Sequence, residues 1–313
     1  MARNVPAGAG TDRPQAPPSR RRIGRRRSLQ PRVLPYVFVS ASLLIVVVLN
    51  LVPLAFTILD SVQNNSFLQP THPFVGLKNY VGVLTDPDFQ NAFRNTMEYL
   101  VLIVVGVIGL GLPFALWLQG VKHRGLMIAL LMIPWAVPGT VNGELWSLIF
   151  KPTNGLLNGI LQMLHITTTD VIWLQGSTAL PLTAVTLIWQ VVPFATLILL
   201  AGLEYIPTEL LEAARVDGAG SVTTFRRITL PLLRPAIAIS IVQASISALA
   251  IFDQIYVLNG NSARTISLVQ QMYLYTFRNL DFGFGVSAAM IATVVSVGVS
   301  LAVLAVVYRE VEY

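Results

Sequence analysis

One polar stretch between two long apolar segments reads Ile206-Pro-Thr-Glu-Leu-Leu-Glu-Ala-Ala-Arg-Val-Asp-Gly218-Ala-Gly-Ser-Val-Thr-Thr-Phe-Arg-Arg-Ile228-Thr-Leu-Pro231. The order of residues predicts a helix, a sharp break and a second helix. Thr208 is expected to cap the first helix, Gly218 and Gly220 to end it, and Ser221 to cap the second. The first helix carries an apolar stripe made of Leu210, Leu211 and Ala214. We therefore expect a short amphipathic elbow at a membrane surface.

The segments on both sides of this stretch are apolar enough to cross a membrane. A bilayer-spanning helix needs about 20 mostly apolar residues. Six segments without Asp, Glu, Lys or Arg fit that description: Val33–Leu59, Tyr99–Val121, Gly125–Gly143, Val171–Leu203, Pro235–Phe252 and Phe282–Tyr308. The sequence therefore predicts an all-α integral membrane protein with six transmembrane helices.

The composition of the whole chain agrees with this prediction. Of the 313 residues, 54% are hydrophobic and only 12% are charged, about half the charged fraction of an ordinary soluble domain. This argues against a water-soluble enzyme built around a single core. The lack of cysteine excludes disulfides and thiolate catalysis, and three scattered histidines argue against a metal site.

The positive charge of the chain is concentrated at its N-terminus. Residues 1–32 hold nine arginines against one aspartate, whereas the net charge of the whole chain is +6. The basic charge therefore belongs to a tail, which argues against a groove for nucleic acid. With the N-terminus inside, 16 of the 21 Lys and Arg residues lie on the cytoplasmic side, as the positive-inside rule requires. Both termini and the polar stretch are thus predicted to be cytoplasmic.

Two regions follow from these patterns. Residues 1–30 are rich in Pro, Arg, Gly and Ala, and we expect them to form a disordered basic cytoplasmic tail. Residues 31–313 are expected to form one six-helix transmembrane domain, with a cytoplasmic loop at about 204–234. The outer loops are too short for a catalytic domain and no Walker-type phosphate loop occurs, so we do not expect an enzyme.

The spacing of small and charged residues in the polar stretch is distinctive. Glu212-Ala213-Ala214 is followed after three residues by Gly218, after nine more by Ile228, and after one more by Leu230-Pro231. This pattern, with Asp217 before the glycine, resembles the EAA loop of bacterial ABC importer permeases. Four further motifs resemble sugar-importer permeases of the MalF/UgpA type: Phe74-Val-Gly-Leu-Lys-Asn-Tyr80, Pro134-Trp-Ala-Val-Pro138, Gly155-Leu-Leu-Asn158 and Phe252-Asp-Gln-Ile-Tyr256.

The resemblance implies a type I ABC importer permease fold in a bacterial plasma (inner) membrane, crossed several times. It implies as partners a second homologous permease subunit, two ATPase subunits, an extracytoplasmic solute-binding protein and membrane lipid. ATP and Mg would be held by the partner ATPase, and no cofactor or metal is expected on this chain. The residues expected to couple to the ATPase are Glu212, Ala213, Ala214, Arg215, Asp217, Gly218, Ile228, Leu230 and Pro231.

Polar side chains within apolar spans are costly and are therefore candidates for a solute path. The residues that meet this criterion are Asn142, Glu144, Gln190, Gln243, Ser245 and Ser247. The resemblance adds positions around the proline of the third span and around the Trp-x-x-x-Pro of the fourth. The predicted path consists of Trp135, Gly139, Asn142, Gln190, Phe194, Gln243 and Ser247. The alternative is that these polar groups only bond neighbouring helices.

The predicted solute is a sugar, either a monosaccharide or an oligosaccharide. An importer for glycerol phosphate or another polyol is the alternative. A phosphate favours cationic groups along its path, and no Lys or Arg lies within the six segments. An ion-coupled secondary transporter is less favoured, because it is expected to contain intramembrane acids or broken helices in both halves of a repeat, and the sequence shows only Glu144, near an outer end.

Overall fold

The computed structural model describes residues 39–40, 43–66 and 71–307. The predicted tail, residues 1–30, lies outside the described residues. The chain divides into two compact units, Met1–Pro53 and Leu54–Tyr313, and each is described by itself. In the first unit, the π-helical segment η1 (Val47–Leu51) leads into the start of α2 (Val52–Ser61).

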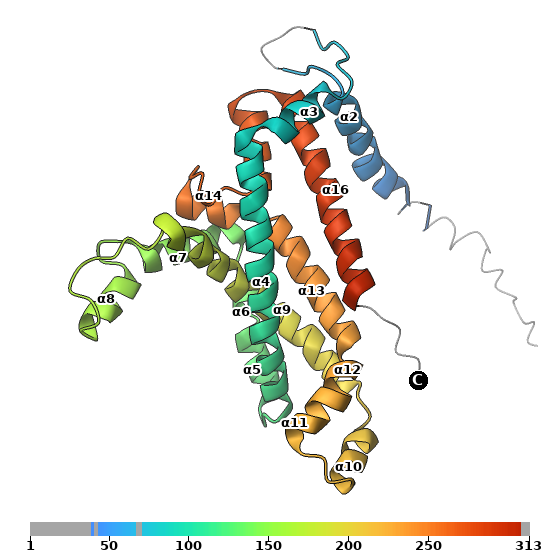
Figure 1. Ribbon diagram of the computed structural model, residues 1–313, viewed down its shortest axis with the longest axis vertical. Helices are drawn as coiled ribbons and strands as arrows, with labels where there is room; N and C mark the ends of the chain where they lie inside the picture. Colours follow the sequence, from blue (N-terminus) through green and yellow to red (C-terminus); the bar gives the residue numbers. More distant parts are fainter. Residues whose placement is uncertain (1–38, 41–42, 67–70, 308–313) are drawn as a thin grey trace, which may run out of the picture. The chain divides into compact units, whose positions relative to one another are not determined.

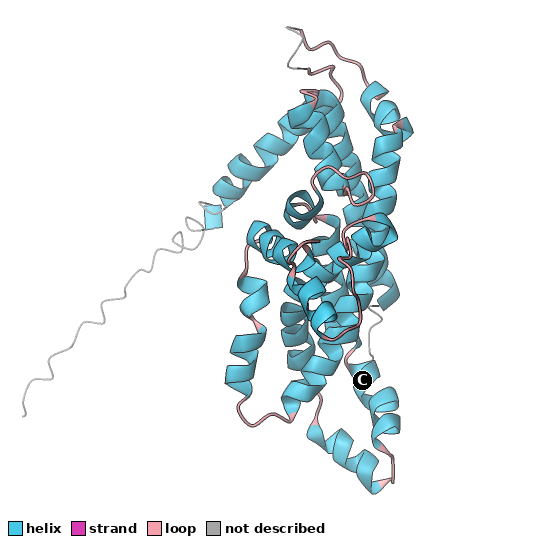
Figure 2. Cartoon of the chain, turned by 90° about the vertical axis from the view of Figure 1, so that its left-hand side faces the viewer, coloured by secondary structure: helices cyan, strands magenta, loops and turns pink. Residues whose placement is uncertain are grey.

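The described residues of the second unit form helices and connecting loops (Figure 1, Figure 2). Figure 1 shows α4, α13 and α16 running along the long axis, with α3 near one end and α10 and α11 at the other. In chain order the elements are α3 (Lys78–Thr85), α4 (Pro87–Gln119), α5 (Arg124–Leu131), α6 (Ile133–Ala136), α7 (Gly139–Phe150), α8 (Leu156–Met163), η2 (Gly176–Thr178), α9 (Ala179–Glu204), α10 (Thr208–Val216), α11 (Ser221–Thr224), η3 (Phe225–Thr229), α12 (Leu230–Leu232), α13 (Arg234–Leu249), α14 (Asp253–Asn259), α15 (Leu268–Tyr273), η4 (Leu274–Arg278) and α16 (Phe282–Val307).

The prediction of six spans agrees with the structure when each of two bent helix pairs counts as one span. The described residues hold four helices long and apolar enough to cross a membrane: Leu43–Ser61, Pro87–Gln119, Gly176–Glu204 and Phe282–Ala305. The bent pairs are Arg124–Ala136 with Gly139–Phe150, and Ser221–Leu232 with Arg234–Leu249. The predicted start of the second span at Tyr99 is too late, because α4 already begins at Pro87.

The prediction of one continuous third span over Gly125–Gly143 is wrong. The α6 helix ends at Ala136, Val137 and Pro138 have ψ angles of 126° and 145°, and α7 then starts in a direction turned by 94°. Proline has no N–H group, and its ring disfavours a helical residue before it, so Pro138 ends the helix. A broken span is therefore present in addition to Glu144, which was the only intramembrane acid or break that the sequence revealed.

The fifth span also differs from its predicted bounds of Pro235–Phe252. The α13 helix ends at Leu249, so Phe252 lies beyond it, and the preceding Ser221–Leu232 segment is bent by 66° from α13. Pro235 lies in the first turn of α13, where a missing N–H group leaves no helical bond unmade. The proline therefore starts this helix rather than breaking it.

The α9 helix is the central packing element of the second unit. Within an apolar stretch of 18 residues, 56% of the residues are buried in α9, compared with 22% in α4. A Cβ atom on Gly106 of α4 would lie 2.5 Å from Ile188 Cδ1 of α9, and one on Gly202 would lie 2.5 Å from Ala236 Cβ of α13. These glycines let α4 and α13 pack closely against α9. Because α9 runs directly into the polar stretch, the core is connected to the elbow through this helix.

Candidate functional site

The coupling segment, defined as residues 206–232, forms the predicted helix, turn and second helix (Figure 1). Its first helix, α10, is followed by Gly218 with a φ of +76°. The Gly218 N–H group donates to the Arg215 carbonyl at 3.0 Å, and the Ala219 N–H group donates to the Ala214 carbonyl at 2.9 Å. This pair of bonds closes a helix end and requires a left-handed residue, usually glycine. The prediction that Gly218 ends the helix is confirmed.

The two predicted helix caps in this segment are wrong. Pro207 occupies the cap position of α10 and Gly220 that of α11, so Thr208 and Ser221 are already the first helical residues. Neither cap position makes a side-chain hydrogen bond. The α10 helix still has an acidic residue in its first turn and Arg215 in its last turn, where each charge is favoured by the helix dipole.

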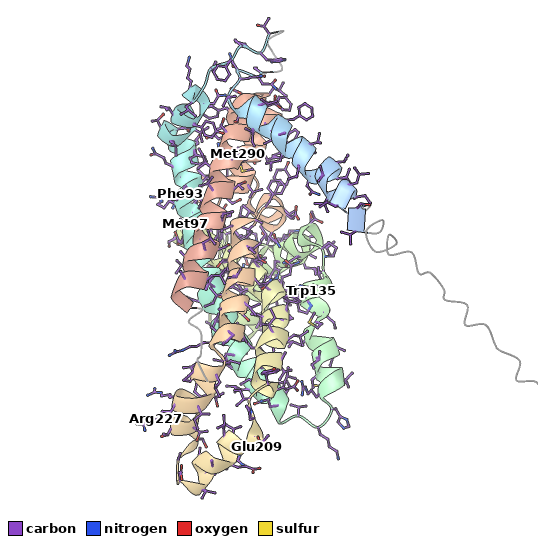
Figure 3. The ribbon with its side chains drawn as sticks, turned by 90° about the vertical axis from the view of Figure 1, so that its right-hand side faces the viewer. Phe93, Met97, Trp135, Glu209, Arg227 and Met290 are labelled. Carbon is purple, nitrogen blue, oxygen red and sulfur yellow. The ribbon has the colours of Figure 1, made fainter. Side chains whose placement is uncertain are left out.

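The coupling segment has a buried side and an exposed side. Ala214 is buried and Leu211 packs against the core that includes Leu203 and Leu233, whereas Leu210 of the predicted apolar stripe is 44% exposed. The exposed residues among the predicted coupling set are Glu212, Ala213, Arg215, Asp217 and Gly218, and the half-buried ones are Ile228, Leu230 and Pro231. Figure 3 shows Glu209 and Arg227 on this segment, at the opposite end of the unit from Phe93. The segment therefore presents polar residues and small residues outward.

An ion pair lies just before the coupling segment. The guanidinium of Arg124, at the start of α5, pairs with the carboxylate of Glu204, at the end of α9. Both side chains are partly exposed, so the pair by itself adds little stability. The pair nevertheless connects the first turn of the third span to Glu204, which lies just before the coupling segment.

The break in the third span is held by the side-chain amide of Gln190 on α9. Gln190 Nε2 donates to the Val137 carbonyl at 2.6 Å. Gln190 Oε1 accepts from Asn142 Nδ2 at 3.1 Å and from Gln254 Nε2 at 2.7 Å. Because Pro138 ends the helix, the Val137 carbonyl lacks a helical partner, and Gln190 supplies one. A single amide on α9 thus bonds the residue that follows α6, a side chain of α7 and a side chain of α14.

Aromatic rings line the α6 side of the same break. The rings of Trp135 and Phe194 are stacked, with centroids 5.4 Å apart and planes at 11°. Phe194 lies one helical turn beyond Gln190 on α9. Trp135, labelled in Figure 3, has 48% of its surface exposed. A Cβ atom on Gly139 would lie 2.7 Å from Asp253 Oδ2, so only glycine fits there without a shift. An exposed ring face and amide groups therefore lie close together.

The structure groups five of the seven predicted path residues at this break: Trp135, Gly139, Asn142, Gln190 and Phe194. The other two, Gln243 and Ser247, lie one turn apart on α13, where Gln243 Nε2 donates to Ser247 Oγ at 3.3 Å. The Gln243 Oε1 atom is buried and has no hydrogen-bond partner among the described residues. These two residues thus form a separate polar pair.

Sequence reasoning missed the contribution of α14 to this site. Gln254 donates a hydrogen bond to Gln190, and Asp253 lies against Gly139. Gln254 and Asp253 belong to the motif Phe252-Asp-Gln-Ile-Tyr256, which the sequence links to the family but not to a site. The available signal was two adjacent polar residues directly after an apolar span. Among the described residues, no three His, Asp or Glu side chains are placed to hold a metal ion.

Comparison with known proteins places these features in a family. Residues 21–312 match the family described as the binding-protein-dependent transport system inner membrane component. The chain belongs to this family. The membership predicted from the EAA-type spacing is therefore confirmed, and the chain is a transport subunit of an ABC importer rather than an enzyme.

Relatives of this family member include two sugar permeases. The chain is 37% identical over 268 residues to the trehalose/maltose transport system permease protein MalF of Thermococcus litoralis, which covers 84% of this chain and 90% of that protein. It is 30% identical over 270 residues to the trehalose transport system permease protein SugA of Mycobacterium tuberculosis, which covers 84% of each chain.

The fold is also that of a solved importer. The crystal structure of a bacterial ABC transporter involved in the import of the acidic polysaccharide alginate matches with a TM-score of 0.76 and 20% identity. The match covers 91% of this chain and 98% of that chain. The predicted type I importer permease fold is confirmed.

Proposed function

We propose that this chain is the permease subunit of an ATP-driven, binding-protein-dependent importer of a sugar. The observation that carries the proposal is the coupling segment, in which a left-handed glycine separates two helices beside an exposed acidic and basic surface. Family membership supports the transport role, and the names of the trehalose and maltose relatives support a carbohydrate solute. A monosaccharide and an oligosaccharide both fit.

The coupling segment is proposed to transmit force from a partner ATPase. Glu212 and Arg215 lie three residues apart on the exposed side of α10, where both can pair with charges of the ATPase. Ala213 and Gly218 are small and exposed, so the ATPase surface can approach closely. Ile228, Leu230 and Pro231 are half-buried and are proposed to hold the second helix against the transmembrane core.

The solute is proposed to pass the break in the third span. Sugars are bound by amide hydrogen bonds and by stacking on aromatic rings, and the break offers both. In the present arrangement Gln190 makes three of its four possible hydrogen bonds, so the second Nε2 hydrogen can donate to a solute hydroxyl without displacing a protein group. Gln243 and Ser247 are proposed to contribute a second polar contact from α13.

The proposed assembly contains a second homologous permease, two ATPase subunits that hold ATP and Mg, and an extracytoplasmic solute-binding protein. A bacterial alginate transporter has been crystallised in complex with a periplasmic protein bound to alginate pentasaccharide, which supports the last partner. The proposed location is a bacterial plasma membrane, with lipid around the apolar helices and both termini in the cytoplasm.

The first test is of the function itself. An affinity-tagged chain expressed with its native partners is expected to copurify an ATPase subunit and a second permease. After reconstitution, the ATPase rate is expected to rise only with the loaded binding protein, and a panel of neutral sugars, polyols and glycerol phosphate identifies the solute. Stimulation by glycerol phosphate but by no sugar would reject the proposed solute class.

A second test addresses the solute path. Gln190→Ala combined with Gln243→Ala is expected to lower uptake at limiting solute about threefold or more, because each change removes an amide that can bond a sugar hydroxyl. The measurement is initial uptake in proteoliposomes, compared with Gln162→Ala, which removes an exposed amide on α8. Unchanged uptake in the double variant would remove both residues from the path.

A further inference from the structure

Four aromatic residues between the start of α14 and the segment η4 form a connected group of rings. The ring centroids of Phe252 and Tyr256 are 5.7 Å apart, and both rings contact Tyr273, at 5.4 Å and 6.0 Å. The ring of Tyr273 in turn lies 5.2 Å from that of Phe277. We call these four residues the α14 ring cluster. Its members come from three consecutive elements, so the chain folds back to bring the rings together.

The α14 ring cluster is accessible from outside the helices. Tyr256 is 45% exposed and Tyr273 is 38% exposed. Phe252, Tyr273 and Phe277 also line a cavity of about 250 Å³. Within the described part of the chain, neither tyrosine hydroxyl makes a hydrogen bond. An exposed tyrosine offers a ring face for stacking and a hydroxyl for hydrogen bonding, which are the two kinds of contact that a sugar ring can make.

A carboxylate on the same face of α14 adds a strong hydrogen-bond acceptor. Asp253 is exposed, and it has no ion pair and no hydrogen bond with the residues that the structure describes. Tyr256 lies three residues after Asp253 and four after Phe252, so its side chain is next to both on the helix surface. An ionised carboxylate accepts through both of its oxygens, and neighbouring hydroxyls of a sugar ring can donate to both.

Asp253 also connects the α14 ring cluster to the break in the third span. A Cβ atom on Gly139 would lie 2.7 Å from Asp253 Oδ2, so the carboxylate lies against the first residue of α7. Trp135 lies on α6, before the same break. Figure 1 shows α14 nearer than α6 to the end of the unit that holds α3, opposite the coupling segment. A solute that enters from that end therefore reaches the α14 ring cluster before it reaches Trp135.

From these contacts we propose that Asp253, Tyr256 and Tyr273 form a second sugar subsite, next to the one at Trp135. One sugar unit stacks at Trp135, another stacks on the two tyrosines, and Asp253 accepts hydrogen bonds from hydroxyls between them. The inference rests on the proposed import of a sugar and narrows it to solutes of at least two sugar units.

The length of the transported sugar is the first test. Uptake is measured in proteoliposomes that hold the assembled transporter and its binding protein, with neutral monosaccharides, disaccharides and trisaccharides that include glucose, trehalose, maltose and maltotriose. The best sugar of two or three units is expected to enter about fivefold faster or more than any monosaccharide, because it uses both subsites. A monosaccharide that enters equally fast would overturn the subsite but leave sugar import intact. Uptake of no sugar would reject the sugar function and the subsite with it.

Protection of a single thiol tests where the transported sugar binds. The chain contains no cysteine, so Tyr256→Cys places one thiol in the α14 ring cluster. A water-soluble maleimide is expected to react with it in the assembled transporter. The transported oligosaccharide is expected to slow this reaction about fivefold or more, whereas glucose is not. At the control Val294→Cys, an exposed position on α16, no sugar is expected to change the rate.

Two results of the labelling would overturn the proposal. A Tyr256→Cys thiol that does not react would show that lipid or the second permease covers the α14 ring cluster. Equal protection by glucose and by the oligosaccharide, or protection by neither, would show that no second sugar unit binds there.

Uptake kinetics separate a solute contact from a role in packing. Tyr256→Ala is expected to raise the oligosaccharide concentration for half-maximal uptake about fivefold, and Tyr256→Phe, which keeps the ring, is expected to raise it less. Phe114→Ala removes a ring that is 39% exposed on α4 and is expected to have no effect. A lower maximal rate in Tyr256→Ala at an unchanged half-maximal concentration would overturn the proposal.

Discussion

Gly218→Val is expected to lower the ATPase stimulation by the loaded binding protein at least tenfold while the transporter still assembles. Gly218 has a φ of +76° and closes the end of α10. A β-branched residue in this conformation costs about 1–2 kcal/mol or more, so the turn between the two helices has to reshape. The surface proposed to meet the ATPase then loses its geometry, although a Cβ atom added at this position meets nothing within 4 Å.

Two matched variants test whether the backbone conformation at Gly218 or the size of the added side chain causes the loss of stimulation. Gly220→Ala changes a glycine two residues away, where φ is −70° and an added Cβ meets nothing within 4 Å, so near-normal stimulation is expected. Gly218→Asn is expected to keep more activity than Gly218→Val, because asparagine tolerates the left-handed region. Equal stimulation in Gly218→Val and the parent protein, measured in proteoliposomes, would show that the turn is not part of the coupling surface.

Trp135→Ala is expected to raise the solute concentration for half-maximal uptake about tenfold. Trp135 stacks on Phe194 and leaves nearly half of its surface exposed beside the break. An aromatic contact contributes about 0.5–1.5 kcal/mol beyond its buried area, and about 1.4 kcal/mol is a factor of ten in binding. Loss of the ring removes both the stack and the face offered to a sugar.

Two control variants accompany Trp135→Ala, one at the same position and one at another tryptophan. Trp135→Phe keeps a ring that can stack on Phe194 and is expected to recover most of the affinity. Trp117→Ala removes a tryptophan that is 54% exposed on α4, and unchanged solute affinity is expected. If Trp135→Ala lowers the maximal uptake rate but not the half-maximal concentration, the ring acts on helix packing and not on solute.

Much of the fold could be predicted from the sequence because a bilayer imposes a simple requirement. A crossing helix must be long and apolar; four described helices meet that requirement alone, and two bent pairs meet it when each pair counts as one span. The sequence did not predict the break at Val137 and Pro138, because the number of apolar residues in a segment does not indicate where its backbone turns. The signal was present in Pro134 and Pro138, which flank a tryptophan within the span.

The site was less predictable than the fold. The spacing of the coupling segment located the left-handed Gly218, since a helix end of this kind needs glycine at that position. The amide network at the break depends on Gln254, which lies 64 residues from Gln190 in the chain. Such a partner follows from how α14 packs against α9, and no local pattern contains that information.

The bend between α6 and α7 also affects the charge along the proposed solute path. The N-terminal end of a helix carries a partial positive charge of about half an elementary charge, from backbone N–H groups that lack helical partners. At α7 this end begins at Gly139, and the carboxylate of Asp253 lies directly against it. The partial charge at this helix end offsets part of the negative charge of the Asp253 carboxylate, so the electrostatic potential at the bend is less negative than the carboxylate alone would make it. If the solute passes here as proposed, the bend discriminates less against an uncharged or anionic solute than an isolated carboxylate would.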